Sequence, residues 1–379
     1  MLKNKILKRI GQFLLAFLSL LLISTSIDGT SIQGIWVVKS TLQSKQSILE
    51  MVEKAAQAGL DQLFVQVNMS GYAYYKSERL PLAVSSFDPL AYLLEKAHQR
   101  GLKVHAWINA FTVGSLGSTP SNPKHVLYQH PDWALVDIDG VSVLEYSKGK
   151  ASEALPALYL EPGLKEVQDW VVENYLEVVR NYAVDGIHFD FIRYPGRSFG
   201  FHPQVGQVFF EQFGFWPEDL VKDWSSLKAK LGREGFLKAT RWFDDYRRAS
   251  ISSIVQRVYL KTKELQPSCI VSAAVFPQYA DAFEQKFQDW FSWLNEGYLD
   301  WALPMVYDAE DYILDLRLND LAGRVDKKKV AIGLGPYQDS CEGTLNKIAK
   351  VKKAEFLGYV LFSYDAIRDS KLWLLLNKE

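Results

Sequence analysis

Polar side chains that could carry chemistry recur at the ends of short apolar segments of the chain. His188 and Asp190 close the segment GIHFDF, and Arg193 follows shortly after; Tyr307 and Asp308 follow another such segment. Carboxyl groups beside amides and aromatic rings suit acid–base catalysis on a polyhydroxylated substrate. The candidate residues are Gln66, Asn68, Tyr74, His105, Trp107, Asn109, Glu161, His188, Asp190, Arg193, Tyr307, Asp308 and Asp365.

Asp190 is the principal catalytic candidate, with Asp308 or Glu161 as its partner, because glycoside hydrolysis uses two carboxyl groups unless the sugar's own acetamide replaces one. The other candidates would bind substrate, and Trp107 would offer a stacking surface. Structural alternatives stay open: an ion pair of Asp190 with Arg193, a helix cap for Asp308, and a favourable helix-terminal position for Glu161. His188 shares a strand face with Asp190 and would orient it or fill the core.

Composition and missing motifs exclude several functions. The chain has 379 residues with 43 Lys+Arg against 44 Asp+Glu, a net charge of −1. It therefore lacks the excess of basic residues that is typical of a nucleic-acid-binding protein. The sequence contains no glycine-rich phosphate loop, zinc-protease or deaminase motif, or serine nucleophile elbow. We therefore expect no cofactor and no metal. A metal-dependent polysaccharide deacetylase using His105, His188 and Asp190 remains a minor alternative that no spacing motif supports.

The apolar segments predict a closed barrel. About eight strands are expected, at 32–38, 63–68, 103–109, 186–191, 270–276, 300–307, 330–335 and 357–363. Amphipathic helices are expected between them, for example at 45–58, 88–100 and 163–182. Strands that are apolar on both faces and alternate with helices indicate an α/β fold, the (β/α)₈ TIM barrel.

Residues beyond a minimal barrel fall in two long insertions. They lie at about 110–160, after the third strand, and about 196–240, after the fourth. Both follow strand carboxyl ends and would build over the face where barrel enzymes place their sites. Neither insertion shows the pattern of an independent core, so residues 27–379 are expected to form one catalytic domain.

Residues 1–26 are typical of a signal peptide. A basic start (Lys3, Lys5, Lys8, Arg9) precedes an apolar run from Ile10 to Ile23, which is short for a membrane span. We expect a secreted or periplasmic monomer whose partner is a polysaccharide and which meets the membrane only through this segment; an uncleaved anchor is the alternative. Cys269 and Cys341 are expected at opposite ends of the barrel and therefore unpaired.

Several strings together resemble the glycosyl hydrolase-like 10 family of bacterial (β/α)₈ proteins. They include IQGIWVV, FVQVNMSGYAYYKSERLP, the stretch LYLEPGLKEVQDWVVENYLEVVRNYAVDGIHFDFIRYPG, and LDWALPMVYD. The resemblance implies a glycosidase that acts on cell-envelope polysaccharide, with peptidoglycan-type amino sugars as the favoured class. Asp190 matches the family's acidic residue at the end of strand four. Phe191 stands where many relatives have a second acid, Asn68 where an arginine is common, and Glu161 where Asn or Asp is frequent.

DGIHFDFIRYP followed by MVYD is also similar to family 18 chitinases, in which an aspartate supports the substrate acetamide and a tyrosine and an aspartate contact it. The proton-donating glutamate of that family would fall near Ile192, which cannot donate. The acid is therefore Asp190, or else Glu161, Asp308 or Asp365. A carbohydrate-binding barrel that has lost catalysis is the alternative from a different class.

Overall fold

The computed structural model describes residues 31–150 and 155–376. The predicted signal peptide, residues 1–26, lies outside these ranges. None of the helices within them has the length and apolar character that crossing a membrane requires.

The described chain forms the predicted (β/α)₈ barrel. Its parallel strands are β1 (Ile32–Val37), β2 (Gln62–Met69), β4 (Lys103–Asn109), β7 (Gly186–Asp190), β8 (Ile270–Val275), β9 (Trp301–Val306), β10 (Ala331–Leu334) and β11 (Gly358–Phe362). β1 pairs with β2 on one side and with β11 on the other, which closes the ring. The strand predictions are confirmed to within a residue or two at each end.

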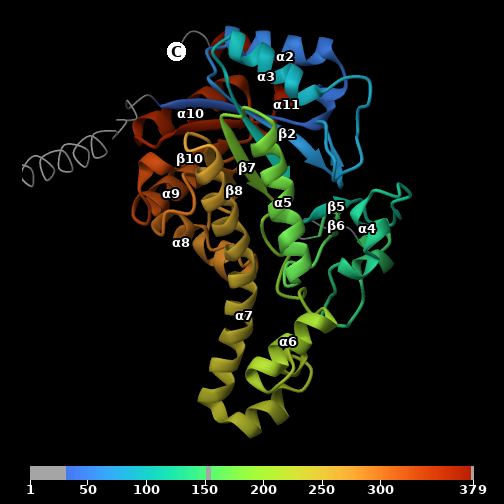
Figure 1. The fold of residues 1–379 in the computed structure, drawn as a ribbon. Coiled ribbons are helices and arrows are strands. Elements are labelled where there is room, and N and C mark those ends of the chain that lie inside the picture. Colours follow the sequence, from blue (N-terminus) through green and yellow to red (C-terminus); the bar gives the residue numbers. More distant parts are fainter. Residues whose placement is uncertain (1–30, 151–154, 377–379) are drawn as a thin grey trace, which may run out of the picture. The chain divides into compact units, whose positions relative to one another are not determined.

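Helices surround the ring (Figure 1). They are α2 (Lys45–Gln57), α3 (Pro89–Gln99), α5 (Lys165–Asn181), α7 (Trp224–Leu265), α8 (Trp290–Asn295), α9 (Asp311–Ala322), α10 (Cys341–Lys353), α11 (Tyr364–Ile367) and α12 (Leu372–Leu376). Short helical turns are η1 (Lys39–Gln43), η2 (Pro131–Trp133), η3 (Val143–Glu145), η4 (Lys148–Lys150), η5 (Pro217–Leu220), η6 (Asp281–Gln285), η7 (Lys327–Lys329) and η8 (Pro336–Gln338).

Local sequence explains where the helices begin and end. The Asp88 side chain accepts a hydrogen bond from the Ala91 amide, and Pro89 fills the first helical position of α3, where no amide donor is needed. Gly101, with φ of 72°, follows the end of α3 and lets the chain turn into β4.

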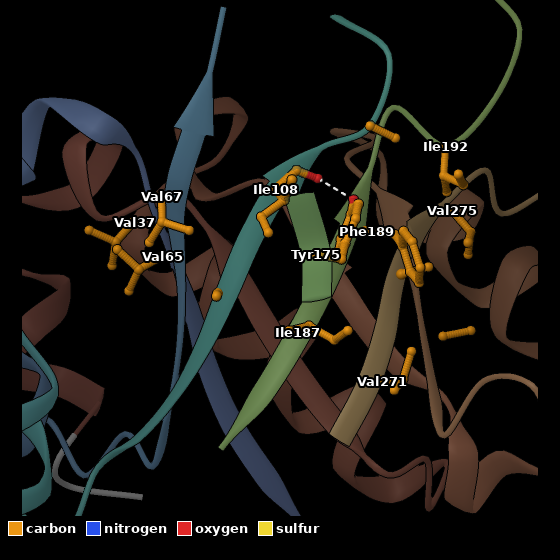
Figure 2. Packing of buried hydrophobic residues seen from close by; sticks show 14 of the residues in the cluster. Val37, Val65, Val67, Ile108, Tyr175, Ile187, Phe189, Ile192, Val271 and Val275 are labelled. Carbon is orange, nitrogen blue, oxygen red and sulfur yellow. Dashed lines mark hydrogen bonds between the residues drawn. The ribbon is translucent and has the colours of Figure 1, made fainter. Parts of the chain in front are cut away.

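The strands separate two apolar layers because their side chains alternate. Trp36 and Phe64 point into the ring and belong to a small inner cluster, whereas Val37 and Val65 belong to the larger cluster between strands and helices. Figure 2 shows this outer layer, in which the Tyr175 hydroxyl of α5 donates a hydrogen bond of 2.7 Å to the Ile108 carbonyl. Helix and strand are thus joined by packing and by a buried hydrogen bond.

The two insertions follow β4 and β7, as predicted. The first contains α4 (Val126–Gln129) and a small antiparallel sheet of β5 (Thr112–Gly114) and β6 (Leu158–Tyr159); β3 (Tyr72–Ala73) adds a short antiparallel partner to β2. The second contains α6 (Pro203–Phe213), η5 and the first part of α7. Contrary to the sequence-based expectation, the second insertion has a hydrophobic cluster of its own, built largely from phenylalanines: Phe201, Phe209, Phe215, Leu220, Leu227, Ala239 and Phe243. α7 then continues to the barrel and packs beside α5 (Figure 1).

Gly186 at the start of β7 gives a test of the inner layer. A Cβ atom there would lie 2.1 Å from His105 Nδ1 and 2.8 Å from the Ile270 carbonyl oxygen. Because a buried ring and a backbone atom must both move, we expect Gly186→Ala to lower the free energy of unfolding by about 1–3 kcal/mol. Gly196→Ala, whose Cβ would meet open space, should change it by less than about 0.5 kcal/mol. Equal urea denaturation curves for the two variants would contradict this account.

Candidate functional site

A cavity of about 430 Å³ opens at the carboxyl ends of the strands, where barrel enzymes place their sites. It brings together six of the predicted site residues: Gln66, Trp107, Asn109, Asp190, Arg193 and Tyr307. The remaining lining residues are Trp36, Val38, Lys39, Ser40, Met69, Phe191, Ala274, Met305 and Phe362. The cavity therefore combines aromatic walls with amides, two cationic side chains and one carboxylate.

Asp190 is held at this cavity by neighbours from two strands. It is 7% exposed. The Trp107 indole donates a hydrogen bond of 3.1 Å to Oδ2, and the Phe191 amide donates one of 2.7 Å to Oδ1. Burial raises the pKa of Asp190 above its usual value, while Arg193 and the two donors oppose that rise. Burial therefore favours the protonated form of Asp190, and the neighbouring donors stabilise its carboxylate after the proton leaves.

Arg193 is held by aromatic rings rather than by a close ion pair. Its guanidinium carbon lies 4.4 Å from the centre of the Phe191 ring and 4.9 Å from that of Phe276. Nη1 is 3.6 Å from Asp190 Oδ1, too long for a strong hydrogen bond. Nη1 is also buried and has no hydrogen-bond partner.

Amides and aromatic rings line the rest of the cavity. Gln66 Nε2 donates to Asn109 Oδ1 over 3.4 Å, and Asn109 Nδ2 donates to the Thr112 hydroxyl over 3.0 Å. Tyr307 stacks on Phe362 with ring centres 5.3 Å apart. Flat apolar faces with a few oriented polar groups suit a sugar ring, which has an apolar face and a polar edge.

Glu161 lies outside the cavity lining, so the structure does not bring it together with Asp190. Its side chain is fully buried (0% exposed). Oε1 accepts hydrogen bonds from the Tyr194 hydroxyl and the Gly163 amide, whereas Oε2 has no partner. Burial raises the pKa of Glu161 to about 7. These contacts join the first insertion to the loop after β7, which is a structural role.

Asp308 and Asp365 also lie outside the lining. Asp308 directly follows Tyr307, and its backbone carbonyl accepts a hydrogen bond of 2.8 Å from Lys347. Asp365 Oδ1 accepts one of 2.9 Å from the Ser40 hydroxyl. Because Ser40 lines the cavity, Asp365 contacts a lining residue without being part of the lining itself.

The two predicted histidines are buried at greater depth in the barrel. The Trp36 indole donates to His188 Nε2 over 3.1 Å, which leaves Nδ1 to donate to the Ser272 hydroxyl over 2.9 Å. His105 stacks on Phe64, donates to Gln62 from Nε2, and lines a separate cavity of about 500 Å³ at the amino ends of the strands. Burial lowers the pKa of both imidazoles, to about 3 for His105. Both rings are therefore neutral, and neither contacts Asp190.

Asn68 and Tyr74, the remaining candidates, do not line the cavity. Asn68 pairs with Ala73 where β2 meets β3, and both Asn68 and Tyr74 are buried. Within the two described ranges, no group of three or more His, Cys, Asp or Glu side chains is arranged to hold a metal ion. Cys269 and Cys341 are both free thiols.

Sequence reasoning missed Lys39 and Ser40, which line the cavity from the end of β1. A signal was present, because both are polar residues that directly follow a predicted strand. Lys39 is half-buried, and its amide donates to Gln66 Oε1 over 3.4 Å.

The sequence of this chain is similar to those of known proteins. The model of the glycosyl hydrolase-like 10 family matches residues 31–334. The chain is 24% identical over 333 residues to glycosyl hydrolase YngK of Bacillus subtilis (strain 168), covering 79% of this chain and 56% of YngK. It is 26% identical over 298 residues to glycosyl hydrolase DigH of Escherichia coli (strain K12), covering 69% of this chain and 58% of DigH. The chain thus spans a little over half the length of these curated relatives.

Among solved structures, the glycoside hydrolase domain of PgaB (BpsB) from Bordetella bronchiseptica is similar in fold. The TM-score is 0.70 at 12% sequence identity, and the match covers 92% of this chain and 98% of that domain. A β-galactosidase from the psychrophilic Marinomonas ef1 matches with a TM-score of 0.60 at 13% identity, covering 87% of this chain and 54% of that one. At these identities the likeness supports the fold alone.

The buried Glu161 predicts a pH-dependent stability. Its folded pKa of about 7 lies above the ordinary 4.5, so the contribution of Glu161 to the free energy of unfolding is fully present below pH 4.5 and falls by roughly 3 kcal/mol as the pH rises through 7. Glu161→Gln should remove this loss, so that between pH 4.5 and 8 the variant gains stability relative to the wild type by about that amount. The control is Glu264→Gln on the exposed face of α7. Parallel pH profiles of chemical denaturation for wild type and Glu161→Gln would contradict the assignment.

Proposed function

The chain belongs to the glycosyl hydrolase-like 10 family, and from this premise we propose that it is an exported glycoside hydrolase that cleaves an amino-sugar polysaccharide of the cell envelope. The proposal is supported by the similarity of its barrel to a glycoside hydrolase domain and by its named relatives, which are glycosyl hydrolases. The basic and apolar pattern of residues 1–26 supports export. The peptidoglycan-type substrate rests on the family resemblance.

The position of Asp190 carries the proposal. Among the residues in the described ranges, it is the one carboxylate that lines the cavity. An acid catalyst must be protonated when substrate binds, and burial favours this form by raising the pKa of Asp190. Trp107 and Arg193 then stabilise the carboxylate that is left once the proton has moved.

A single acid favours a mechanism in which the substrate supplies the second group. Asp190 donates its proton to the glycosidic oxygen as the bond from that oxygen to the anomeric carbon breaks. The carbonyl oxygen of the sugar's 2-acetamido group attacks the anomeric carbon and replaces the leaving group. Water then attacks the same carbon and displaces the acetamide oxygen, which becomes a carbonyl again, while the Asp190 carboxylate takes a proton from that water, which restores the acid. This mechanism requires an N-acetylated amino sugar and gives retention of configuration.

A carbohydrate-binding protein without catalysis is the second candidate. It is favoured by the same observation that no second carboxylate of the described residues lines the cavity. The hydrogen bonds that Asp190 accepts would then serve only to fix a sugar-holding surface.

Asp190→Asn separates these candidates. We expect turnover of purified peptidoglycan glycan, followed by mass spectrometry of the products, to fall by about 10²–10⁴-fold while glycan binding is kept. Asp369→Asn, an exposed charge near the carboxyl terminus, is the matched control and should keep full activity. Asp308→Asn tests a two-carboxylate mechanism, since a loss as large as that of Asp190→Asn would show that a second acid acts. Undiminished turnover by Asp190→Asn would refute the role of Asp190, and a wild type that binds glycan without cleaving it would support the binding protein.

Trp107→Phe gives a pH test of the same acid. The Trp107 indole bonds to the ionised carboxylate and so lowers the pKa of Asp190. Without it the pKa of Asp190 should rise, and the alkaline limb of kcat/KM should move to higher pH. Trp216→Phe, at an exposed tryptophan of the second insertion, should leave the limb in place. A limb that stays fixed in Trp107→Phe would show that another group is the acid.

A further inference from the structure

The aromatic wall of the cavity continues beyond the cavity lining. Tyr307 and Phe362 line the cavity and stack on each other, and both contact Tyr337 of η8, which is not part of the lining. The Tyr337 ring centre lies 6.3 Å from each of theirs, at interplanar angles of 70° and 76°. These are edge-to-face contacts, an arrangement that aromatic pairs favour. Tyr337 therefore packs against one wall of the cavity from the outside.

Tyr337 is also open to solvent, with 51% of the residue exposed. Among the exposed aromatic side chains in the described ranges, it is the one whose ring contacts rings of the cavity lining. Its hydroxyl accepts a hydrogen bond of 3.1 Å from Gln338 Nε2. An aromatic ring that is half open beside the cavity offers an apolar surface on which the apolar face of a sugar can stack.

Glycine at position 335 allows Tyr337 to approach the cavity wall closely. A Cβ atom on Gly335 would lie 3.0 Å from Cε1 of Tyr337 and 3.2 Å from Cβ of Tyr307. A larger residue would press against both tyrosines, and a packed site accommodates such added volume poorly. The absence of a side chain at Gly335 therefore lets the exposed tyrosine lie beside the one that lines the cavity.

A buried lysine fixes the loop that carries Tyr337. Lys347 of α10 donates hydrogen bonds to the Asp308 carbonyl over 2.8 Å and to the Ala309 carbonyl over 2.7 Å. Its Nζ also lies 2.8 Å from Asp339 Oδ2, in an ion pair. Asp308 and Ala309 follow β9, and Asp339 directly follows η8. Lys347 thus joins the loop after β10 to the loop after β9, and a surface that is held in place before a ligand arrives loses less entropy on binding.

The proposed reaction requires the glycan to extend beyond the cavity. Asp190 protonates the oxygen that joins two sugar residues, so a polysaccharide continues on both sides of that oxygen. The cavity of about 430 Å³ receives the sugar whose bond is broken. Further sugar residues then lie over the carboxyl ends of the strands, where η8 follows β10 and carries Tyr337.

We propose that Tyr337 forms a sugar-binding platform outside the cavity, on which a residue of the glycan stacks while another residue occupies the cavity. The inference deepens the proposed function and rests on it for the chemistry of the ligand. The platform adds affinity only for a chain that is long enough to reach from the cavity to Tyr337. It therefore makes the protein selective for glycan chains over single sugars.

Binding of a long and a short ligand tests the platform. The full chain carrying Asp190→Asn, which we expect not to cleave glycan, is titrated with a tetrasaccharide of alternating N-acetylglucosamine and N-acetylmuramic acid. The methyl glycosides of the two single sugars are the short ligands, because they can occupy the cavity without reaching Tyr337. Adding Tyr337→Ala should weaken binding of the tetrasaccharide by about three- to tenfold, the value of an aromatic contact, and leave binding of the single sugars unchanged.

Further variants assign the effect to the ring. Tyr337→Phe keeps the ring and should bind the tetrasaccharide as tightly as the parent, whereas Tyr337→Leu should lose as much as Tyr337→Ala. The matched control is Tyr128→Ala, which removes a tyrosine of similar exposure, 55%, from α4 of the first insertion and should change nothing. Thermal melting checks that each variant folds, and Tyr337→Leu decides if Tyr337→Ala does not. A loss in Tyr337→Phe equal to that in Tyr337→Ala would overturn stacking on the ring.

Kinetics with Asp190 intact give a second measurement. Tyr337→Ala should raise KM for purified glycan strands by about three- to tenfold and keep kcat, because the platform contacts the substrate equally before and during bond cleavage. A fall in kcat at unchanged KM would show that the substitution disturbs the reacting groups in the cavity, and would overturn the platform.

The outcomes separate this inference from the proposed function. Equal losses for the tetrasaccharide and the single sugars, or no loss for the tetrasaccharide, overturn the platform, and cleavage of glycan by the wild type would then leave the glycosidase standing. A loss confined to the tetrasaccharide, in a protein whose wild type cleaves no glycan, supports the platform and refutes the glycosidase. Absence of tetrasaccharide binding when Tyr337 is present overturns the platform.

Discussion

The burial of the Asp190 carboxyl group at the end of a strand constrains much of this structure. A buried carboxylate loses the solvation of water and must be given donors in return. Asp190 receives them from the Trp107 indole and the Phe191 amide, with Arg193 beyond at 3.6 Å. Trp107 belongs to β4 and Asp190 to the neighbouring β7, and Asn109 of β4 is the partner of Asp190 in the strand register. The hydrogen bond therefore depends on the register of two strands that are far apart in the sequence.

The inner layer of the ring fixes that register. His188 lies two residues before Asp190 on the same face of β7, and its neutral ring is bonded to Trp36 of β1 and Ser272 of β8. Deeper in the ring, His105 stacks on Phe64. Both ring nitrogens of His188 and Nε2 of His105 are paired across strands, so a slip of one residue would leave them unpaired in an apolar interior. The histidines that first suggest catalysis thus support the site by holding the strands that present it.

The sequence predicted the ring well because each strand is apolar on both faces and each helix carries its own end signals. It could also assign inward-facing residues, since alternation determines which face a side chain occupies. It could not predict how far along the barrel each inward-facing side chain lies. His105 and Trp107 face inward from one strand, yet only Trp107 reaches the cavity at the carboxyl end. Glu161 and Asp308 were expected at the site from their places after strands or before helices. Their surroundings depend on loops whose course no local pattern determines, and Tyr194 and Gly163 hold Glu161 elsewhere.

The charge around Asp190 affects how it holds its proton. In a site with two carboxylates, mutual repulsion would raise the pKa of one acid. Here burial raises the pKa of Asp190, and Arg193 opposes that rise. Arg193 therefore limits how strongly the protein holds the proton. Phe191 contributes at this point: it has a backbone φ of 50°, its amide bonds to Asp190, and its ring holds Arg193. Phe191 thus sets the geometry of both the acid and the cation beside it.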